Sequence, residues 1–236
     1  MKSLIYLPQC SSTNDEIIDF INLSHLEEDF LAIYTFNQTN GRGQYGNKWK
    51  ILANQNLAFS FAIKTQKISC SDILFNYYTA ILVRDFIANL TKTEVKIKWP
   101  NDLILKNKKI CGMLFEKKGN YLVSGIGINI LQENFENLPK AGSILSQTNL
   151  KFDLKNFAES LYHYISEKLM TENIPDNILE LYNQNLYKKN TISVFEKDKV
   201  RQNGIIQNTD NNGFLWIELE NDGLQKFFHK EIKLLY

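Results

Sequence analysis

Residues 94–130 read EVKIKWPNDLILKNKKICGMLFEKKGNYLVSGIGINI and decide the fold class. Short runs rich in Val, Ile, Leu and Phe alternate with Asn, Asp, Gly and Lys at turn positions, which is typical of consecutive β-strands. Strands that follow one another through tight links pair in antiparallel fashion. The stretch therefore predicts a largely antiparallel sheet with strands over EVKIKW, LILK, KICGMLFE and NYLVSGIGINI.

The N-terminal flank of this stretch alternates between strand and helix patterns. Ser12 or Thr13 is placed to cap a helix, and Thr13 with Glu16 fits a capping box. The apolar patterns predict a strand at LIYL, a helix at NDEIIDFINL, strands over 30–36 and 56–63, and a core helix over 71–90 with a broad apolar face.

The C-terminal flank first returns to helices and then changes character. Helical periodicity covers 153–170 and 176–187, and from about residue 190 only short strands remain, separated by QNG, DNNG and NDG turns. Such a pattern is typical of a small β-barrel. We therefore predict an α+β fold: a mixed, largely antiparallel sheet with helices in domain 1–187, followed by a barrel in domain 188–236.

The bulk composition is that of an ordinary globular protein, with 44% hydrophobic and 22% charged residues and a formal net charge of +1. It carries no basic footprint for nucleic acid, and no stretch has the length of a signal peptide or a membrane span. We expect a cytoplasmic protein that binds neither DNA nor membrane. Cys10, Cys70 and Cys111 are widely spaced and predict buried thiols rather than disulfides or a zinc site.

The segment NGRGQYGNKWK, residues 40–50, holds three glycines and one of only three arginines in the chain. Its G-x-G-x-x-G spacing fits a dinucleotide turn or a kinase loop poorly, because no amphipathic helix follows and the next acidic residue is Asp72. Glycines let the backbone approach a ligand, and Arg42 can grip an anion with a forked hydrogen bond. An anion-binding cover and an ordinary solvated loop both remain open from this segment alone.

Two further segments place charge and aromatic rings beside turns. In KWPND, Lys98 and Trp99 end a strand before a turn, and Trp99 with Trp49 offers a platform for a nucleobase. In KKICGMLFE, period-two alternation puts Lys109 on the face of Cys111, with Gly112 on the opposite face. The glycines of GIGIN indicate that a ligand approaches the backbone there.

These segments, in this order, resemble the biotin protein ligase (biotin–acetyl-CoA-carboxylase ligase) family. The resemblance rests on Ser12-Thr13-Asn14, the G-R-G…G…W loop, K-W-P-N-D, K-x-x-G and G-I-G-I-N, and it covers the chain from about residue 5 to its end. It implies a catalytic domain similar to class II aminoacyl-tRNA synthetases and a C-terminal SH3-like barrel. With no helix-turn-helix module ahead of the first strand, the chain resembles the ligase-only class.

The resemblance implies the family reaction. Biotin and ATP give biotinyl-5′-AMP and pyrophosphate, with Mg²⁺, and the biotinyl group then passes to a lysine of a biotin carboxyl carrier protein domain. Such adenylation needs positioning and positive charge rather than a Ser-His-Asp set, so His25, His163 and His229 are expected to be structural or exposed. A homodimer is possible.

The resemblance also implies a role for each matching residue. Lys109 is the principal catalytic cation, joined by Arg42, and Asp102 places Mg²⁺ or orients Lys98 or Arg42. The biotin site is expected to comprise Ser12, Thr13, Gln38, Gly41, Arg42, Lys109 and Gly112, and the ATP site Gln44, Trp49, Lys98, Asn101, Asp102, Lys109 and Asn129.

One position departs from the family pattern, because Gln44 stands where many members have a further Arg. We expect a neutral amide to hold the adenylate less tightly. Two alternatives to the main interpretation remain. A lipoate or octanoate ligase shares the K-x-x-G lysine but typically has an R-R-x-x-G-G-G stretch that is missing here, and a non-catalytic adenine-nucleotide or biotin-binding module would not require both Lys109 and Arg42.

Overall fold

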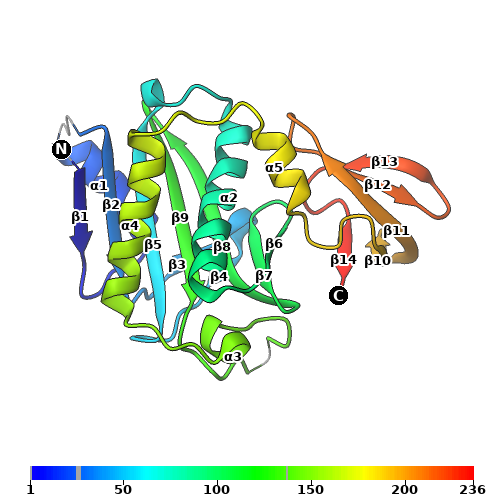
Figure 1. Cartoon of the computed structure of the whole chain (residues 1–236), viewed down its shortest axis with the longest axis horizontal. Coiled ribbons are helices and arrows are strands. Elements are labelled where there is room, and N and C mark those ends of the chain that lie inside the picture. Colours follow the sequence, from blue (N-terminus) through cyan, green and yellow to red (C-terminus); the bar gives the residue numbers. More distant parts are fainter. Residues whose placement is uncertain (1, 25–27, 137) are drawn as a thin grey trace.

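The computed structural model describes residues 2–24, 28–136 and 138–236, and its centre is a seven-stranded sheet in the order β1-β2-β5-β9-β8-β7-β6 (Figure 1). β1 pairs with β2 in parallel, and the other neighbours are antiparallel, which confirms the predicted sheet. The strands are β1 (Lys2–Tyr6), β2 (Phe30–Thr35), β5 (Asn56–Lys64), β6 (Val95–Lys98), β7 (Asp102–Leu105), β8 (Lys108–Lys118) and β9 (Tyr121–Asn129).

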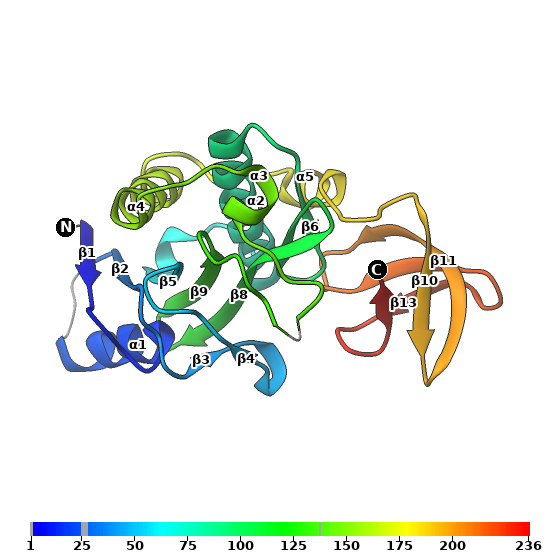
Figure 2. The same ribbon diagram turned by 90° about the horizontal axis from the view of Figure 1, so that it is seen from below.

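Helices cover both faces of this sheet. In β2 the alternate residues Leu31 and Ile33 pack with Ile17 of α1 (Thr13–Ser24), whereas Phe30 and Ala32 belong to the main core on the other face. That face is covered by α2 (Asp72–Thr91) and α4 (Leu154–Met170), on the opposite side from α1 (Figure 2). Because both faces are covered, β2 is buried along its whole length.

The start of α1 differs from the predicted capping box. The helix begins at Thr13 itself, and the N–H of Glu16 donates to the carbonyl of Ser12. The Thr13 hydroxyl instead lies within hydrogen-bonding distance of the Gln38 and Ser60 side chains. The prediction of a Thr13–Glu16 capping box is therefore wrong, because Ser12 and not Thr13 is the residue that precedes the helix.

A bulge in β8 corrects the predicted facing of Lys109. Leu103 of β7 pairs with Cys111, but the next residue, Ile104, pairs with Lys109, so one β8 residue between them has no partner. An extra residue shifts the alternation by one position. Lys109 consequently shares a face with Gly112, where a Cβ would lie 3.3 Å from its Nζ. Cys111, on the other face, is fully buried.

The C-terminal region forms a five-stranded antiparallel sheet in the order β13-β12-β11-β10-β14, in agreement with the predicted SH3-like element. α5 (Ile178–Gln184) packs between this sheet and α2: Asn183 donates to the carbonyl of Thr209 on β11, and Tyr182 stacks on Tyr77 of α2. The domain division at residue 188 stays a prediction. The strands are β10 (Ile192–Lys197), β11 (Val200–Thr209), β12 (Leu215–Leu219), β13 (Gly223–Phe227) and β14 (Lys233–Leu235).

Smaller elements complete the chain. The 40–50 segment contains a two-stranded hairpin of β3 (Gly41–Arg42) and β4 (Lys48–Trp49), and a short helix, α3 (Ile144–Thr148), was not predicted. Within the described residues, no helix is both long and apolar enough to cross a membrane. All three cysteines are free; Cys10 and Cys111 are buried as predicted, and Cys70 is half-buried.

Candidate active site

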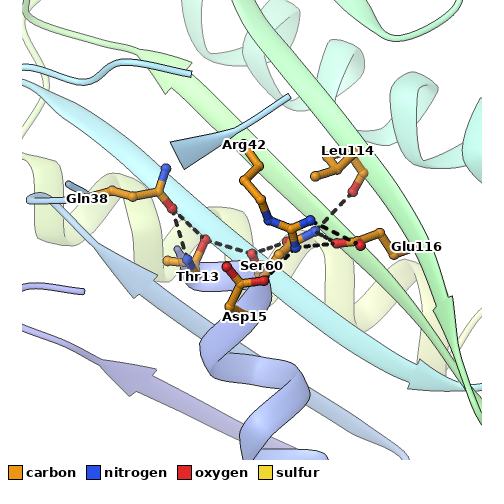
Figure 3. Close-up of polar contacts among 8 residues, drawn as sticks. Thr13, Asp15, Gln38, Arg42, Ser60, Leu114 and Glu116 are labelled. Carbon is orange, nitrogen blue, oxygen red and sulfur yellow. Dashed lines mark hydrogen bonds and ion pairs between the residues drawn. The ribbon is translucent and has the colours of Figure 1, made fainter. Parts of the chain in front are cut away.

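A cavity of about 120 Å³ is lined by residues at the start of α1, by the β3–β4 hairpin and by β8 and β9. α1 and the hairpin lie on the same side of the sheet (Figure 2). One wall is a buried polar cluster formed where α1 begins. The Thr13 N–H donates to Gln38 Oε1 at 2.9 Å, and the Ser60 hydroxyl lies 2.7 Å from Thr13 Oγ1 and donates to Asn14 Oδ1 at 2.6 Å (Figure 3). Buried polar groups fixed in this way present directed donors and acceptors to a small polar ligand.

The glycines around this cavity make room for side chains. A Cβ on Gly125 would lie 2.2 Å from Asn14 Oδ1, and a Cβ on Gly127 would lie 2.2 Å from the indole of Trp49. A Cβ on Gly41 would meet Gln38 Nε2 at 2.3 Å. The close approach predicted at GIGIN is present, but side chains of the protein itself make it.

Lys109 is the central cation of the site. Its Nζ lies 2.7 Å from Asp102 Oδ1 on β7, and Lys98 lies 3.9 Å from the other oxygen of the same carboxylate. Burial lowers the pKa of Lys98, and the charges of Lys109 and Lys140 add to this effect, while Asp102 opposes it. Asp102 thus orients Lys109 and, more distantly, Lys98.

Trp49 separates the small cavity from a larger one. The second cavity, of about 900 Å³, extends from the hairpin to Gln132, residues 134–136 and 138–141, and Tyr236. Trp49, Lys48 and Lys109 line both cavities. Lys109 Nζ lies 5.4 Å from the centroid of the Trp49 ring, which places the cation where the two cavities meet.

Arg42 lies on the opposite side of the small cavity, between two carboxylates (Figure 3). Its Nη2 lies 2.5 Å from Asp15 Oδ1 on α1 and 3.0 Å from Glu116 Oε2 on β8. Partial burial disfavours the charge, but Glu116 and Asp15 together raise the pKa of Arg42. Of the alternative roles considered for Asp102, orienting Arg42 is not observed: the guanidinium joins the hairpin to α1 and β8 instead.

The structure gathers most of the predicted site residues around these cavities. Asn129 lines the larger cavity and donates to the carbonyl of Gly142, and Asn101 donates to the carbonyl of Met113. Lys98 lines neither cavity and faces a third one, while Gly41 lies behind Gln38. The small cavity is lined by Ser12, Thr13, Gln38, Arg42, Gln44, Trp49, Asn101, Asp102, Lys109 and Gly112.

Sequence reasoning assigned no role to several polar residues of the site. Asn14 belongs to the S-T-N motif, which was a usable signal, and its amide donates to Glu116 Oε2 at 2.9 Å. Ser60 and Glu116 lie in apolar strands with no local signal. His229, expected to be structural or exposed, lines the small cavity beside Asp102 and Lys109. His25 lies outside the described residues.

The acidic residues of the site offer few ligands for Mg²⁺. Among the described residues, no three His, Cys, Asp or Glu side chains come together as a metal site. Asp102 offers a single carboxylate, already paired with Lys109. Nucleotide-bound Mg²⁺ is commonly held by one or two carboxylates together with water and substrate phosphates, so this donor set fits such an ion. Asp102 as a metal ligand stays a prediction.

Comparison with known proteins identifies the family. The biotin/lipoate A/B protein ligase family model matches residues 6–132, more than half of the chain, and the chain therefore belongs to this family. It is 30% identical over 139 residues to the bifunctional ligase/repressor BirA of Escherichia coli (strain K12), covering 57% of this chain and 42% of that protein.

Other relatives have the same character. The chain is 25% identical over 173 residues to the biotin--[acetyl-CoA-carboxylase] ligase of Mycobacterium tuberculosis, covering 72% of this chain and 65% of the relative. It thus spans between 42% and 65% of the length of these two curated relatives. Biotin protein ligase from Aquifex aeolicus, solved in complex with biotin and ATP, superimposes with a TM-score of 0.77 at 21% identity over 99% of this chain and 98% of that one.

Proposed function

We propose that this protein is an ATP-dependent biotin protein ligase. It forms biotinyl-5′-AMP from biotin and ATP and transfers the biotinyl group to a lysine of a biotin carboxyl carrier domain. The observation that carries the proposal is the position of Lys109 at the junction of the two cavities. A cation there can contact a carboxylate held in the small cavity and a phosphate held in the large one.

The small cavity suits the polar head of biotin. Thr13, Gln38 and the neighbouring Asn14 form a wall of hydrogen-bonding groups that fits a ureido ring, which both donates and accepts. The proposed biotin site also keeps three residues from the sequence prediction: Ser12, Gly41 and Gly112. The dithiolane ring of lipoate has no group that donates and accepts hydrogen bonds, so it does not match this polar wall, which favours biotin over lipoate.

The larger cavity is assigned to ATP. Trp49 gives an aromatic wall for adenine, and Asn129 supplies a neutral hydrogen-bonding group in the same cavity. Asn101 and Gln44, which line the small cavity, and Lys98, which lines the third one, are assigned to the nucleotide on the sequence prediction alone. When bound, Mg²⁺ would neutralise phosphate charge beside Asp102. Relatives solved with biotin and ATP or with biotinylated ATP support both substrate assignments.

In this assignment the first half-reaction needs no nucleophilic side chain. A biotin carboxylate oxygen attacks the α-phosphorus, the bond to the oxygen that bridges the α- and β-phosphorus atoms breaks, and pyrophosphate leaves with the electron pair. Lys109, oriented by Asp102, stabilises negative charge on the attacking carboxylate and the α-phosphate. Holding both reactants on either side of one cation also removes most of the orientational cost.

One experiment tests this proposal against its alternatives. The purified protein is incubated with ATP, Mg²⁺, biotin or lipoate, and a biotin carboxyl carrier domain, and the mass of the carrier is measured. We expect a mass increase of one biotinyl group. An increase with lipoate alone would indicate a lipoate ligase, and no increase with either acid would indicate a non-catalytic binding module. The cytoplasmic location and a homodimer stay predictions.

A further inference from the structure

One titratable residue of the C-terminal region, His229, lines the small cavity. His229 lies between β13 and β14, on a turn closed by its own hydrogen bonds: the N–H of Phe228 donates to Glu231 Oε2 at 2.6 Å, and the N–H of Glu231 donates to the carbonyl of Phe228 at 3.1 Å. The imidazole meets the buried ring of Trp99 edge-on, with centroids 5.7 Å apart. Trp99 leads directly into the turn that carries Asp102, so the histidine is held at the catalytic end of the sheet.

The position of His229 joins two cavities. It lines the small cavity with Asp102 and Lys109, and it also lines a third cavity of about 540 Å³ between the two sheets. Lysines 98, 230 and 233 line that third cavity. The histidine therefore stands in a cationic part of the molecule, on a different element from every other residue of the proposed reaction centre.

The second half-reaction poses a protonation problem that the remaining side chains do not solve. A free lysine has a pKa of ~10.4, so the acceptor arrives as an ammonium without a lone pair for attack. Among the described residues that line the small cavity, Arg42, Lys48 and Lys109 are cations and cannot take its proton. Asp102 is bound to Lys109 at 2.7 Å. His229 is the remaining ionisable side chain.

We propose that His229 is the general base for transfer of the biotinyl group to the acceptor lysine; this inference rests on the proposed function. His229 takes one proton from the acceptor ammonium, and the freed lone pair forms the C–N bond to the biotinyl carbonyl carbon. The bond from that carbon to the phosphate oxygen breaks, and AMP leaves with its electron pair. The second nitrogen proton passes to solvent as the amide forms.

The surroundings keep this base ready at neutral pH. Burial lowers the pKa of His229, and Lys98 on β6, Lys230 on its own turn and Lys109 on β8 lower it further, while Asp102 on β7 opposes them. The neutral form of His229 therefore prevails from a pH below the ordinary histidine pKa upward. Transfer should rise with pH as His229 loses its proton and then level off, because above its pKa the base is fully available.

The test uses the full chain with His229→Gln, and His163→Gln on the exposed face of α4 as the matched control. Synthetic biotinyl-5′-AMP is supplied, and single-turnover transfer to the carrier domain is measured from pH 5 to 9. We expect His229→Gln to slow transfer about a hundredfold at pH 7. It should also abolish the low-pH limb, leaving a rate that climbs steadily with the fraction of free amine. His163→Gln should match the wild type.

Two further measurements separate a base from a structural residue. Hydroxylamine is neutral at pH 7 and needs no base, so His229→Gln should transfer biotin to it at close to the wild-type rate. With His229→Ala, imidazole added to the buffer should restore transfer to the carrier lysine and leave the wild type unaffected. Equal losses with both acceptors, or transfer by His229→Gln at the wild-type rate and pH profile, would overturn the inference.

Different measurements would contradict the base assignment of His229 and the proposed ligase function. Pyrophosphate release from ATP and biotin reports the first half-reaction alone, and it should change less than about threefold in His229→Gln, because adenylation removes no proton. A wild-type chain that releases no pyrophosphate would contradict the ligase function itself. Normal release combined with unchanged transfer in His229→Gln would contradict only the base assignment.

Discussion

The two ends of the small cavity both carry cations paired with carboxylates, but with opposite balances. At one end, Lys109 shares the single carboxylate of Asp102 with Lys98, which lies just outside the cavity, and this group carries an excess of one positive charge. At the other end, Arg42 lies between Asp15 and Glu116, which leaves an excess of one negative charge. The Lys109 end therefore attracts anions, whereas the guanidinium at the Arg42 end is already neutralised.

This difference gives the two ends different roles: the Lys109 end contacts substrates, and the Arg42 end holds the hairpin in place. A lysine with one partner keeps N–H groups for substrate oxygens, because an ammonium has three donors. Arg42 uses its donors on α1 and β8 and so fastens the hairpin over the cavity. Its side chain and that of Asp15 are 41% and 48% exposed, and exposed ion pairs contribute only ~0–1 kcal/mol each. We infer that this fastening can open when substrates enter.

The largest expected effect is at the cationic end. Lys109→Ala should lower the rate of adenylation, measured as pyrophosphate release, by about a hundredfold to a thousandfold, because it removes a preorganised positive charge from the transition state. Thermal unfolding should change little, since the side chain is partly exposed. Lys117→Ala on the same strand, where the lysine pairs with Asp72, is the control and should adenylate normally. Wild-type adenylation by Lys109→Ala would remove Lys109 from the mechanism.

The next effect tests the partner of that lysine. Asp102→Asn keeps the shape of the side chain but removes the charge that holds Lys109, so adenylation should fall about tenfold to a hundredfold through misplacement of the cation. Asp85→Asn, which breaks an ion pair with Arg84 away from the site, is the matched control. A rate equal to that of the wild type would show that Lys109 needs no orienting carboxylate.

A smaller effect is expected at Gln44 in the hairpin. Its amide lines the small cavity, and a charged hydrogen bond stabilises a ligand by roughly 1 kcal/mol more than a neutral one. Gln44→Arg should therefore slow release of biotinyl-5′-AMP from the purified protein roughly fivefold to tenfold. Gln44→Lys distinguishes charge from the forked shape of Arg. Equal release by the wild type and Gln44→Arg would contradict the idea that this chain holds its adenylate loosely.

The smallest effect concerns the attachment of the hairpin. The double variant Asp15→Asn and Glu116→Gln removes both charges that bind Arg42, at a cost of ~1–2 kcal/mol in the closed hairpin. Amide hydrogen exchange over residues 41–50 should rise severalfold, with less than a threefold change in adenylation at saturating substrates. Exchange equal to that of the wild type would show that Arg42 does not fasten the hairpin.

The larger elements of the fold could be predicted because their signals are local. The apolar runs of β2 and β5, the long apolar face of α2 and the turns after residue 190 each arise within one stretch of chain. The bulge in β8 could not be read in this way. It depends on how β8 pairs with β7, and a single unpaired residue reversed the predicted face of Lys109.

The same limit applies to the site residues: local signals identified some of them, and long-range contacts brought in the others. Motif spacing selected residues that do surround the cavities, including Lys109, Trp49 and Gln38. It did not identify partners that are distant in sequence. The Arg42 contacts with Asp15 and Glu116 join residues 27 and 74 positions away, and His229 comes from the other sheet.

By itself the sequence determined the strand and helix pattern, the family resemblance and the set of residue types at the site, because hydrophobic period and motif spacing are properties of neighbouring positions. Only the tertiary structure decided which face Lys109 occupies, which carboxylates take Arg42 and that a C-terminal histidine enters the cavity. Those outcomes depend on strand register and on packing between two sheets, and both arise from contacts that the order of residues along the chain does not display.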